Sequence, residues 1–196
     1  ISPNPGDAGG SVGSAAYFLK NDLHFKISVN QYEYLGKDYS NEEIKKIIQS
    51  FNIDKKYFYN YMDFNELFPI VCKKLIDEKV IGWFQGKMEW GPRALGNRSI
   101  LADSRNPKIK EIINSKIKRR ESFRPFAPSI LEDHTKDWFE VNKTVPYMSE
   151  VYKIRDDKKI KIPGVVHVDG SGRLQTVNEK NNPIYYSLIK EFYKIT

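Results

Sequence analysis

The chain has 196 residues, which suits one or two domains, and 40% of them are hydrophobic, enough to build a buried core. Its net charge is +7, the fraction of charged residues is that of an ordinary soluble protein, and no apolar run approaches the roughly 20 residues that span a bilayer. The single cysteine, Cys72, excludes an internal disulfide framework, and with no signal-peptide pattern it favours a reducing, cytoplasmic compartment.

The chain opens on Ile1 rather than methionine, and "ISPNPGDAGG" reads as the middle of a longer protein. Glycines in residues 6–10 stand before a small-residue helix, an arrangement that lets backbone N–H groups approach an anion. Ser40 and Glu43 form a capping box at the start of a further helix. The aromatic run 55–64 could stack nucleic-acid bases, but we expect it to join two structural units.

A helix is predicted over 66–78, with Pro69 in the first turn, where backbone N–H groups lack internal partners. An apolar strand is expected over 79–85, and Cys72 should be a buried structural thiol. The side chains expected to face inward from the helix are Leu67, Ile70, Val71, Leu75 and Ile76.

Asn106 followed by Pro107 predicts another helix start, and its apolar face should hold Ile109, Ile112, Ile113 and Ile117. The cations of its last turn also suit the negative end of a helix dipole, which alone could account for two of them. Residues 123–132 carry two prolines and lead into an apolar strand.

Residues 164–177 predict two short strands around a Gly-Ser-Gly turn, and Asn182 with Pro183 begins a last helix. Alternation would place four side chains on one polar face, which either is solvated or contacts a ligand. These are His167, Asp169, Arg173 and Gln175. Helices and strands alternate through residues 66–196, so the fold class is α/β.

The excess charge is concentrated in one window. Residues 87–124 hold 11 basic and 4 acidic side chains, and the rest of the chain is balanced. The stretch "GKMEWGPRALGNRSILAD" (86–103) places Arg93 and Arg98 on a constrained Gly/Pro backbone, and arginine forks match phosphate oxygens bidentately. It has no Walker pattern. Arginines fixed in this way indicate a site for one specific small anion.

Two motifs in order, "GPRALGNRSILAD" and "FRPFAPS", followed by "HVDGSGRLQTV", resemble the C-terminal domain of the carbamoyltransferase family that includes tobramycin, nodulation-factor and cephamycin carbamoyltransferases. The resemblance covers roughly residues 30–196. "SPNPGDAGGSVGSAAYF" is similar to the end of that family's N-terminal actin-like domain. The resemblance implies three parts: residues 1–25 from the N-terminal domain, a linker over 26–64, and a YrdC-like domain over 65–196, a twisted mixed sheet with flanking helices that is truncated at its C-terminus.

The resemblance implies that the domain takes ATP, with Mg²⁺, and carbamoyl phosphate. It would form carbamoyladenylate for transfer to a hydroxyl of a sugar or other small acceptor. Transfer would use the rest of the same polypeptide, whose N-terminal domain would hold iron or another divalent metal. Fixed cations fit this chemistry because joining two polyanions requires their repulsion to be neutralised. No membrane is expected, nucleic acid is disfavoured, and the oligomeric state stays open, a homodimer included.

The resemblance assigns a role to each matching residue. Arg93 and Arg124 would grip phosphate, Lys118 would sit at the transferring group, and Arg173 would bridge to nucleotide phosphates. Asp7 matches a metal-site position whose histidine partners would lie upstream. Further orienting or nucleotide contacts would come from Asn97, Arg98, Ser99, His167 and Asp169.

Two departures from the family pattern stand out: Lys87 replaces a usual arginine, and an apolar strand with an Asn-Thr-Ser loop is expected after Thr196. Two alternatives therefore remain beside the enzyme. One is a module that binds nucleotide or carbamoyl phosphate without turnover. The other is a tRNA-modification domain of the threonylcarbamoyl-adenylate type, although the aromatics lie apart from the basic window, unlike in proteins that track a nucleic-acid backbone.

Overall fold

A computed structural model describes residues 4–26, 33–51 and 59–196 of the chain. Seven stretches in these residues are α-helical: α1 (Asp7–Asn21), α2 (Asn41–Ser50), α3 (Phe64–Ile76), α4 (Ile109–Ile112), α5 (Thr135–Trp138), α6 (Asp156–Lys159) and α7 (Pro183–Ile195). The strands are β1 (Ile81–Phe84), β2 (Arg98–Leu101), β3 (Ser129–Leu131), β4 (Val151–Lys153), β5 (Ser171–Arg173) and β6 (Gln175–Val177). A π-helical segment, Ile113–Lys118, continues α4.

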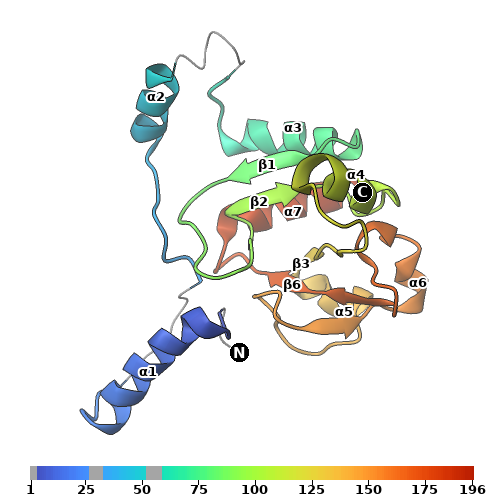
Figure 1. Cartoon of the computed structure of the whole chain (residues 1–196). Helices are drawn as coiled ribbons and strands as arrows, with labels where there is room; N and C mark the ends of the chain where they lie inside the picture. The colour runs from blue at the N-terminus through green and yellow to red at the C-terminus, as the bar shows by residue number, and fades with distance from the viewer. Residues whose placement is uncertain (1–3, 27–32, 52–58) are drawn as a thin grey trace.

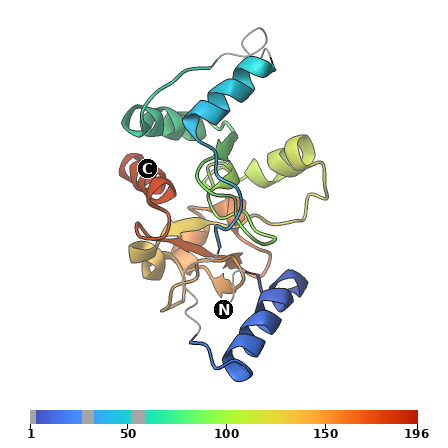
Figure 2. The same ribbon diagram turned by 90° about the vertical axis from the view of Figure 1, so that its left-hand side faces the viewer.

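Helices α1 and α2 project from the rest of the molecule in both views (Figures 1 and 2), and neither contains a buried residue. The capping box predicted at Ser40 and Glu43 is present at the start of α2. The part of the aromatic run at 55–58 lies outside the described residues, and Tyr59 and Tyr61 are exposed. The described helices include none that is long and apolar enough to cross a membrane.

The chain contains both helices and strands, so the predicted α/β class is confirmed. Its described strands form pairs. β1 and β2 are antiparallel, as are β4 and β5, whereas β3 and β6 are parallel. The sequence predicted one twisted sheet, but in the described part of the chain the pairs form three separate two-stranded sheets. Each strand has only three or four residues, so the fold relies on side-chain packing rather than on a long hydrogen-bonded ladder.

Two apolar cores hold the sheets and helices together. The first joins α3, β1, β6 and α7, which pack through Phe68, Val71, Cys72, Leu75, Trp83, Val177, Tyr185 and Leu188. The second surrounds the β4–β5 pair and contains Phe139, Val145, Ile154, Ile162, Val165 and Leu174. Cys72 is fully buried in the first core, as predicted for a structural thiol.

The predicted helix over 66–78 has a different start and a narrower buried face. α3 begins at Phe64 because the Asp63 side chain accepts the Glu66 N–H, so Pro69 is the sixth helical residue and lies beyond the first turn. Ile70 and Ile76 were predicted to face inward but are exposed, since α7 covers only one side of α3. Ile117 was also predicted to face inward but is exposed. It lies in the π-helical segment, whose different period turns its side chain away from the buried side chains of Ile109 and Ile113.

The prediction for 164–177 is wrong in its first strand. Pro163–Val165 is a short 3₁₀ turn, and Val168 is fully exposed rather than buried on an alternating face. The second predicted strand divides at Leu174 into β5 and β6, which pair with different partners. The four polar side chains expected on one face therefore do not share one.

Candidate functional site

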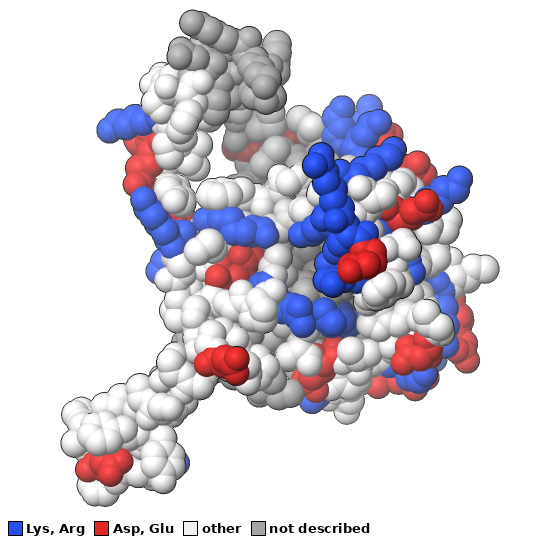
Figure 3. Space-filling view, in the orientation of Figure 1, with Lys and Arg blue, Asp and Glu red and all other residues white. Residues whose placement is uncertain are grey.

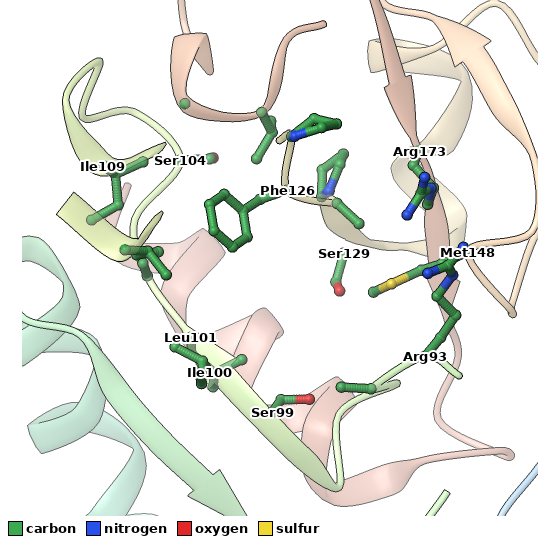
Figure 4. Close-up of a pocket in the computed structure, with 18 of the residues that line it drawn as sticks. Arg93, Ser99, Ile100, Leu101, Ser104, Ile109, Phe126, Ser129, Met148 and Arg173 are labelled. Atoms are coloured by element: carbon green, nitrogen blue, oxygen red, sulfur yellow. The ribbon is translucent and has the colours of Figure 1, made fainter. Parts of the chain in front are cut away.

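A pocket of about 370 Å³ lies at the junction of the two apolar cores. Its walls come from the segment after β1, the chain before β3, the end of β5 and the inner face of α7 (Figure 4). The three motifs that the sequence singled out, far apart along the chain, each supply part of this lining: Arg93 and Ser99, Phe126 and Ser129, and Arg173.

Four basic side chains line the pocket: Arg93, Lys118, Arg120 and Arg173. Figure 4 shows Arg93 and Arg173 on the same wall. Burial, together with the positive charge of Arg93, lowers the pKa of Arg173 from its ordinary value. Among the residues that the structure describes, the lining includes no carboxylate. Such a pocket favours a ligand with several negative charges. Figure 3 shows Lys and Arg side chains gathered near the middle of the face of the molecule that Figure 1 presents to the viewer.

The segment 90–98, here called the arginine loop, is folded around the carboxylate of Glu89. Glu89 is only 9% exposed, and its Oε1 accepts the backbone N–H groups of Leu95, Asn97 and Arg98 at 2.7, 2.9 and 3.1 Å. Three N–H groups that converge on one carboxylate fix the loop. The only sign of this in the sequence is an isolated acid in a basic window, and the sequence prediction missed it.

Gly96 lets the arginine loop approach α7. Its φ is +104°, and a Cβ at this position would lie 2.2 Å from the ring of Tyr185. The Gly96 N–H donates to the Ser99 hydroxyl at 2.9 Å, and Ser99 lines the pocket. Both the left-handed backbone and the close approach therefore require glycine here.

Arg98, a predicted ligand contact, turns away from the pocket. Its guanidinium donates to the carbonyls of Gln85, Gly86 and Lys37 at 2.7, 3.0 and 3.2 Å, and lies 3.5 Å from the centre of the Phe84 ring. Because its donors are committed to backbone carbonyls, Arg98 holds the base of the arginine loop.

Asn97, predicted to orient a ligand, is buried in a network of amides. Its Nδ2 donates to the Lys87 carbonyl at 2.7 Å, and its Oδ1 accepts from the side chains of Gln85 and Asn182. Neither Asn97 nor Arg98 lines the pocket, whereas Ser99 does.

Residues 119–124, here called the basic loop, are held by one amide. Asn114 is fully buried, its Nδ2 donates to the carbonyls of Ser122 and Arg124, and its Oδ1 accepts from Arg120 Nε at 2.8 Å. The Arg120 guanidinium also lies 5.0 Å from the centre of the Phe126 ring. Arg120 and Phe126 both line the pocket, and the sequence prediction singled out neither.

Of the two predicted contacts Lys118 and Arg124, only Lys118 lines the pocket. Lys118 ends the π-helical segment and lines the pocket. The Arg124 side chain is 52% exposed, is paired with Glu121 at 2.8 Å, and is outside the lining. Of the three residues predicted to act on the reacting groups, the pocket brings together Arg93 and Lys118.

His167 and Asp169 lie beside β5 but do not line the pocket. Ser171 joins them, because its hydroxyl donates to Asp169 Oδ1 at 2.5 Å and lies 3.1 Å from His167 Nδ1. Burial lowers the pKa of His167, and the nearby Arg173 acts in the same direction. The neighbouring Asp169 carboxylate acts in the opposite direction, but burial has the larger effect.

Asp7 is exposed at the first position of α1. The ranges 4–26, 33–51 and 59–196 contain no group of three or more His, Cys, Asp or Glu side chains that could hold a metal ion. Asp7 as a metal ligand stays a prediction.

Comparison of the sequence with known proteins identifies the family to which the chain belongs. The model of the carbamoyltransferase C-terminus matches residues 72–196. An uncharacterized protein of Synechocystis is 39% identical over the whole chain, which covers 36% of that protein, and nodulation protein NolO of Bradyrhizobium diazoefficiens is 37% identical with the same coverage. Nodulation protein U of Rhizobium tropici is 43% identical over 62% of the chain and 21% of its own length. The chain thus spans about a third of the relatives that it matches from end to end.

Proposed function

Since the chain belongs to the carbamoyltransferase family through the C-terminal domain of that family, we propose that it is the donor-activating part of an O-carbamoyltransferase. Its substrates would be carbamoyl phosphate and ATP, and the product would be carbamoyladenylate. The whole polypeptide would then pass the carbamoyl group to a hydroxyl of a small molecule or sugar. The observation that carries the proposal is the pocket that Arg93, Lys118 and Arg173 line from separate segments of the chain.

The proposed activation of carbamoyl phosphate takes place in two reactions. Water attacks the carbonyl carbon of carbamoyl phosphate, the C–O bond to phosphate breaks, and carbamate and inorganic phosphate form. A carbamate oxygen then attacks the α-phosphorus of ATP and expels pyrophosphate, which leaves carbamoyladenylate. Both steps develop negative charge on leaving phosphates, and fixed cations stabilise that charge without reorganising during the reaction.

Roles for the cations follow from their positions. Arg93 and Arg173, on one wall, would bind the phosphates of the two donors, and Lys118, on the other basic segment, would sit at the transferring group. Arg124, predicted to grip phosphate, would have to leave Glu121 to do so. Ser99 and Ser129 offer hydroxyl groups to the same space.

Metal ions are proposed at two places. Mg²⁺ would enter with ATP, but the residues that line the pocket supply no carboxylate to hold it, so the donor set does not fit a protein-ligated Mg²⁺ and no step is assigned to it. The divalent metal expected in the N-terminal part would need ligands in addition to Asp7.

The test is a release assay on the full-length polypeptide. We expect phosphate and pyrophosphate to appear in equal amounts only when carbamoyl phosphate and ATP are both present. Binding of both donors without release of either product would indicate a binding module instead. Tight, salt-sensitive RNA binding without pyrophosphate release would favour a tRNA-modification domain.

A further inference from the structure

Gln175, the first residue of β6, carries a buried amide that is bonded at both ends. The side chain is among the most buried polar groups described, at 2% exposure. Its Nε2 donates to the Leu95 carbonyl at 2.9 Å, and its Oε1 accepts from the Ser129 hydroxyl at 2.8 Å. A carbonyl only accepts, so the bond to Leu95 fixes which end of the amide is the nitrogen.

These two bonds join three of the segments that line the pocket. Leu95 belongs to the arginine loop and follows Arg93 by two residues. Ser129 begins β3 and lines the pocket. Gln175 itself follows Arg173 by two residues, and its backbone N–H donates to the Pro128 carbonyl at 3.0 Å. One amide therefore connects all three motifs at the edge of the pocket.

A connection of this kind is needed because Arg93 and Arg173 repel each other. Both line the same wall of the pocket, their proximity contributes to the lowered pKa of Arg173, and the described part of the lining holds no carboxylate that would offset the two charges. Glu89 fixes the backbone of the arginine loop, and the Leu95 carbonyl ties that loop to its surroundings because it accepts bonds from Gln175 and, at 3.0 Å, from the Tyr34 hydroxyl.

We propose that Gln175 is a positioning residue, which holds the loop that carries Arg93 against the strand segment that carries Arg173, so that both cations face one anion site. The inference rests on the proposed function for the identity of the donors. It does not require turnover, because the preorganised pair of arginines would also bind free pyrophosphate. Preorganisation raises affinity by removing the cost of ordering the loop when the anion binds.

The test is a double-mutant cycle on the full-length polypeptide, with pyrophosphate affinity measured by calorimetry. Gln175→Met keeps the length of the side chain and removes both bonds. We expect it to weaken pyrophosphate binding roughly tenfold, as for the loss of one or two buried hydrogen bonds. In an Arg93→Met background the same substitution should weaken binding less than about threefold, because the loop no longer carries a cation to position.

Thr176→Val is the matched control. Thr176 is the next residue on β6, is equally buried, and accepts the Val145 N–H through its hydroxyl at 2.8 Å, but it makes no bond to the arginine loop. This variant should lose stability in urea while its pyrophosphate affinity stays within about twofold of the native value. If Gln175→Met does not fold, Ser129→Ala removes one of the two bonds and should give a smaller loss with the same coupling to Arg93.

Two results would overturn the positioning role. One is that Gln175→Met weakens pyrophosphate binding equally in the native protein and in the Arg93→Met variant. The other is that Thr176→Val weakens pyrophosphate binding as much as Gln175→Met does. Failure of the proposed function looks different. In that case the native protein binds pyrophosphate and shows the coupling, yet releases no phosphate from carbamoyl phosphate and ATP. A native protein that does not bind pyrophosphate would overturn both.

Discussion

The arginine loop and the basic loop both bring cations to the pocket, but they are held in different ways. The arginine loop closes around a buried acid, with three backbone N–H groups on Glu89. The basic loop rests on the single amide of Asn114, and its outer cation, Arg124, is paired with Glu121 in solvent. Each loop has one buried anchor side chain, but the arginine loop is bonded further through the Leu95 carbonyl and the Asn97 amide, so we expect it to be held more firmly.

Removing the anchor of the arginine loop should have the largest effect. Glu89→Ala leaves three loop N–H groups without their acceptor, and we expect it to lower the free energy of unfolding by about 3–5 kcal/mol, measured by urea denaturation. Glu121→Gln is the matched control in the basic loop, where the carboxylate is exposed. The midpoint of urea denaturation of this variant should scarcely differ from that of the native protein. Similar losses for both variants would show that the two loops are held equally.

The two loops should also differ in their contribution to anion binding. Arg93→Met removes a cation that lines the pocket, and we expect pyrophosphate affinity, measured by calorimetry, to fall by about tenfold to a hundredfold. Arg124→Met removes an exposed cation that is already paired, so its loss should be several times smaller. The reverse order would mean that Arg124 leaves Glu121 and enters the pocket when ligand binds.

Asn114→Ala should loosen the basic loop alone. It removes the acceptor of Arg120 and the donor to the Arg124 carbonyl, at a cost of about 2 kcal/mol in unfolding free energy. Proteolysis should then cut residues 119–124 faster while the arginine loop stays protected. Increased cleavage in both loops would indicate that the two are coupled.

The smallest effect should come from pH. The folded state holds the pKa of His167 below its unfolded value of about 6.5, so below that pH the unfolded state binds the proton more readily. Stability should therefore fall as the pH drops from 7 to 5. His167→Asn keeps a polar group towards Ser171 and should make this fall shallower in urea titrations at several pH values. An unchanged slope would show that His167 does not contribute.

The sequence predicted the convergence of basic segments better than it predicted what holds them. Arg93 could be chosen because arginines on a constrained turn are a local signal, whereas Lys118 and Arg173 received their roles from the family resemblance. Glu89, Asn114 and Gln175 are anchors whose partners come from other turns or strands, so nothing next to them in the chain marks the role. The same limit explains the strand wrongly expected at 164–169, since alternation cannot show whether a partner strand lies alongside.

We propose above all that Arg93, Lys118 and Arg173 bind two phosphorylated donors together in one pocket. A crystal structure of the full-length polypeptide with carbamoyl phosphate and a non-hydrolysable ATP analogue tests it most directly. We expect phosphate density in contact with both Arg93 and Arg173, and the carbamoyl group beside Lys118. Ligand density at another place on the molecule, with these three side chains making no contact to it, would contradict the proposed donor site.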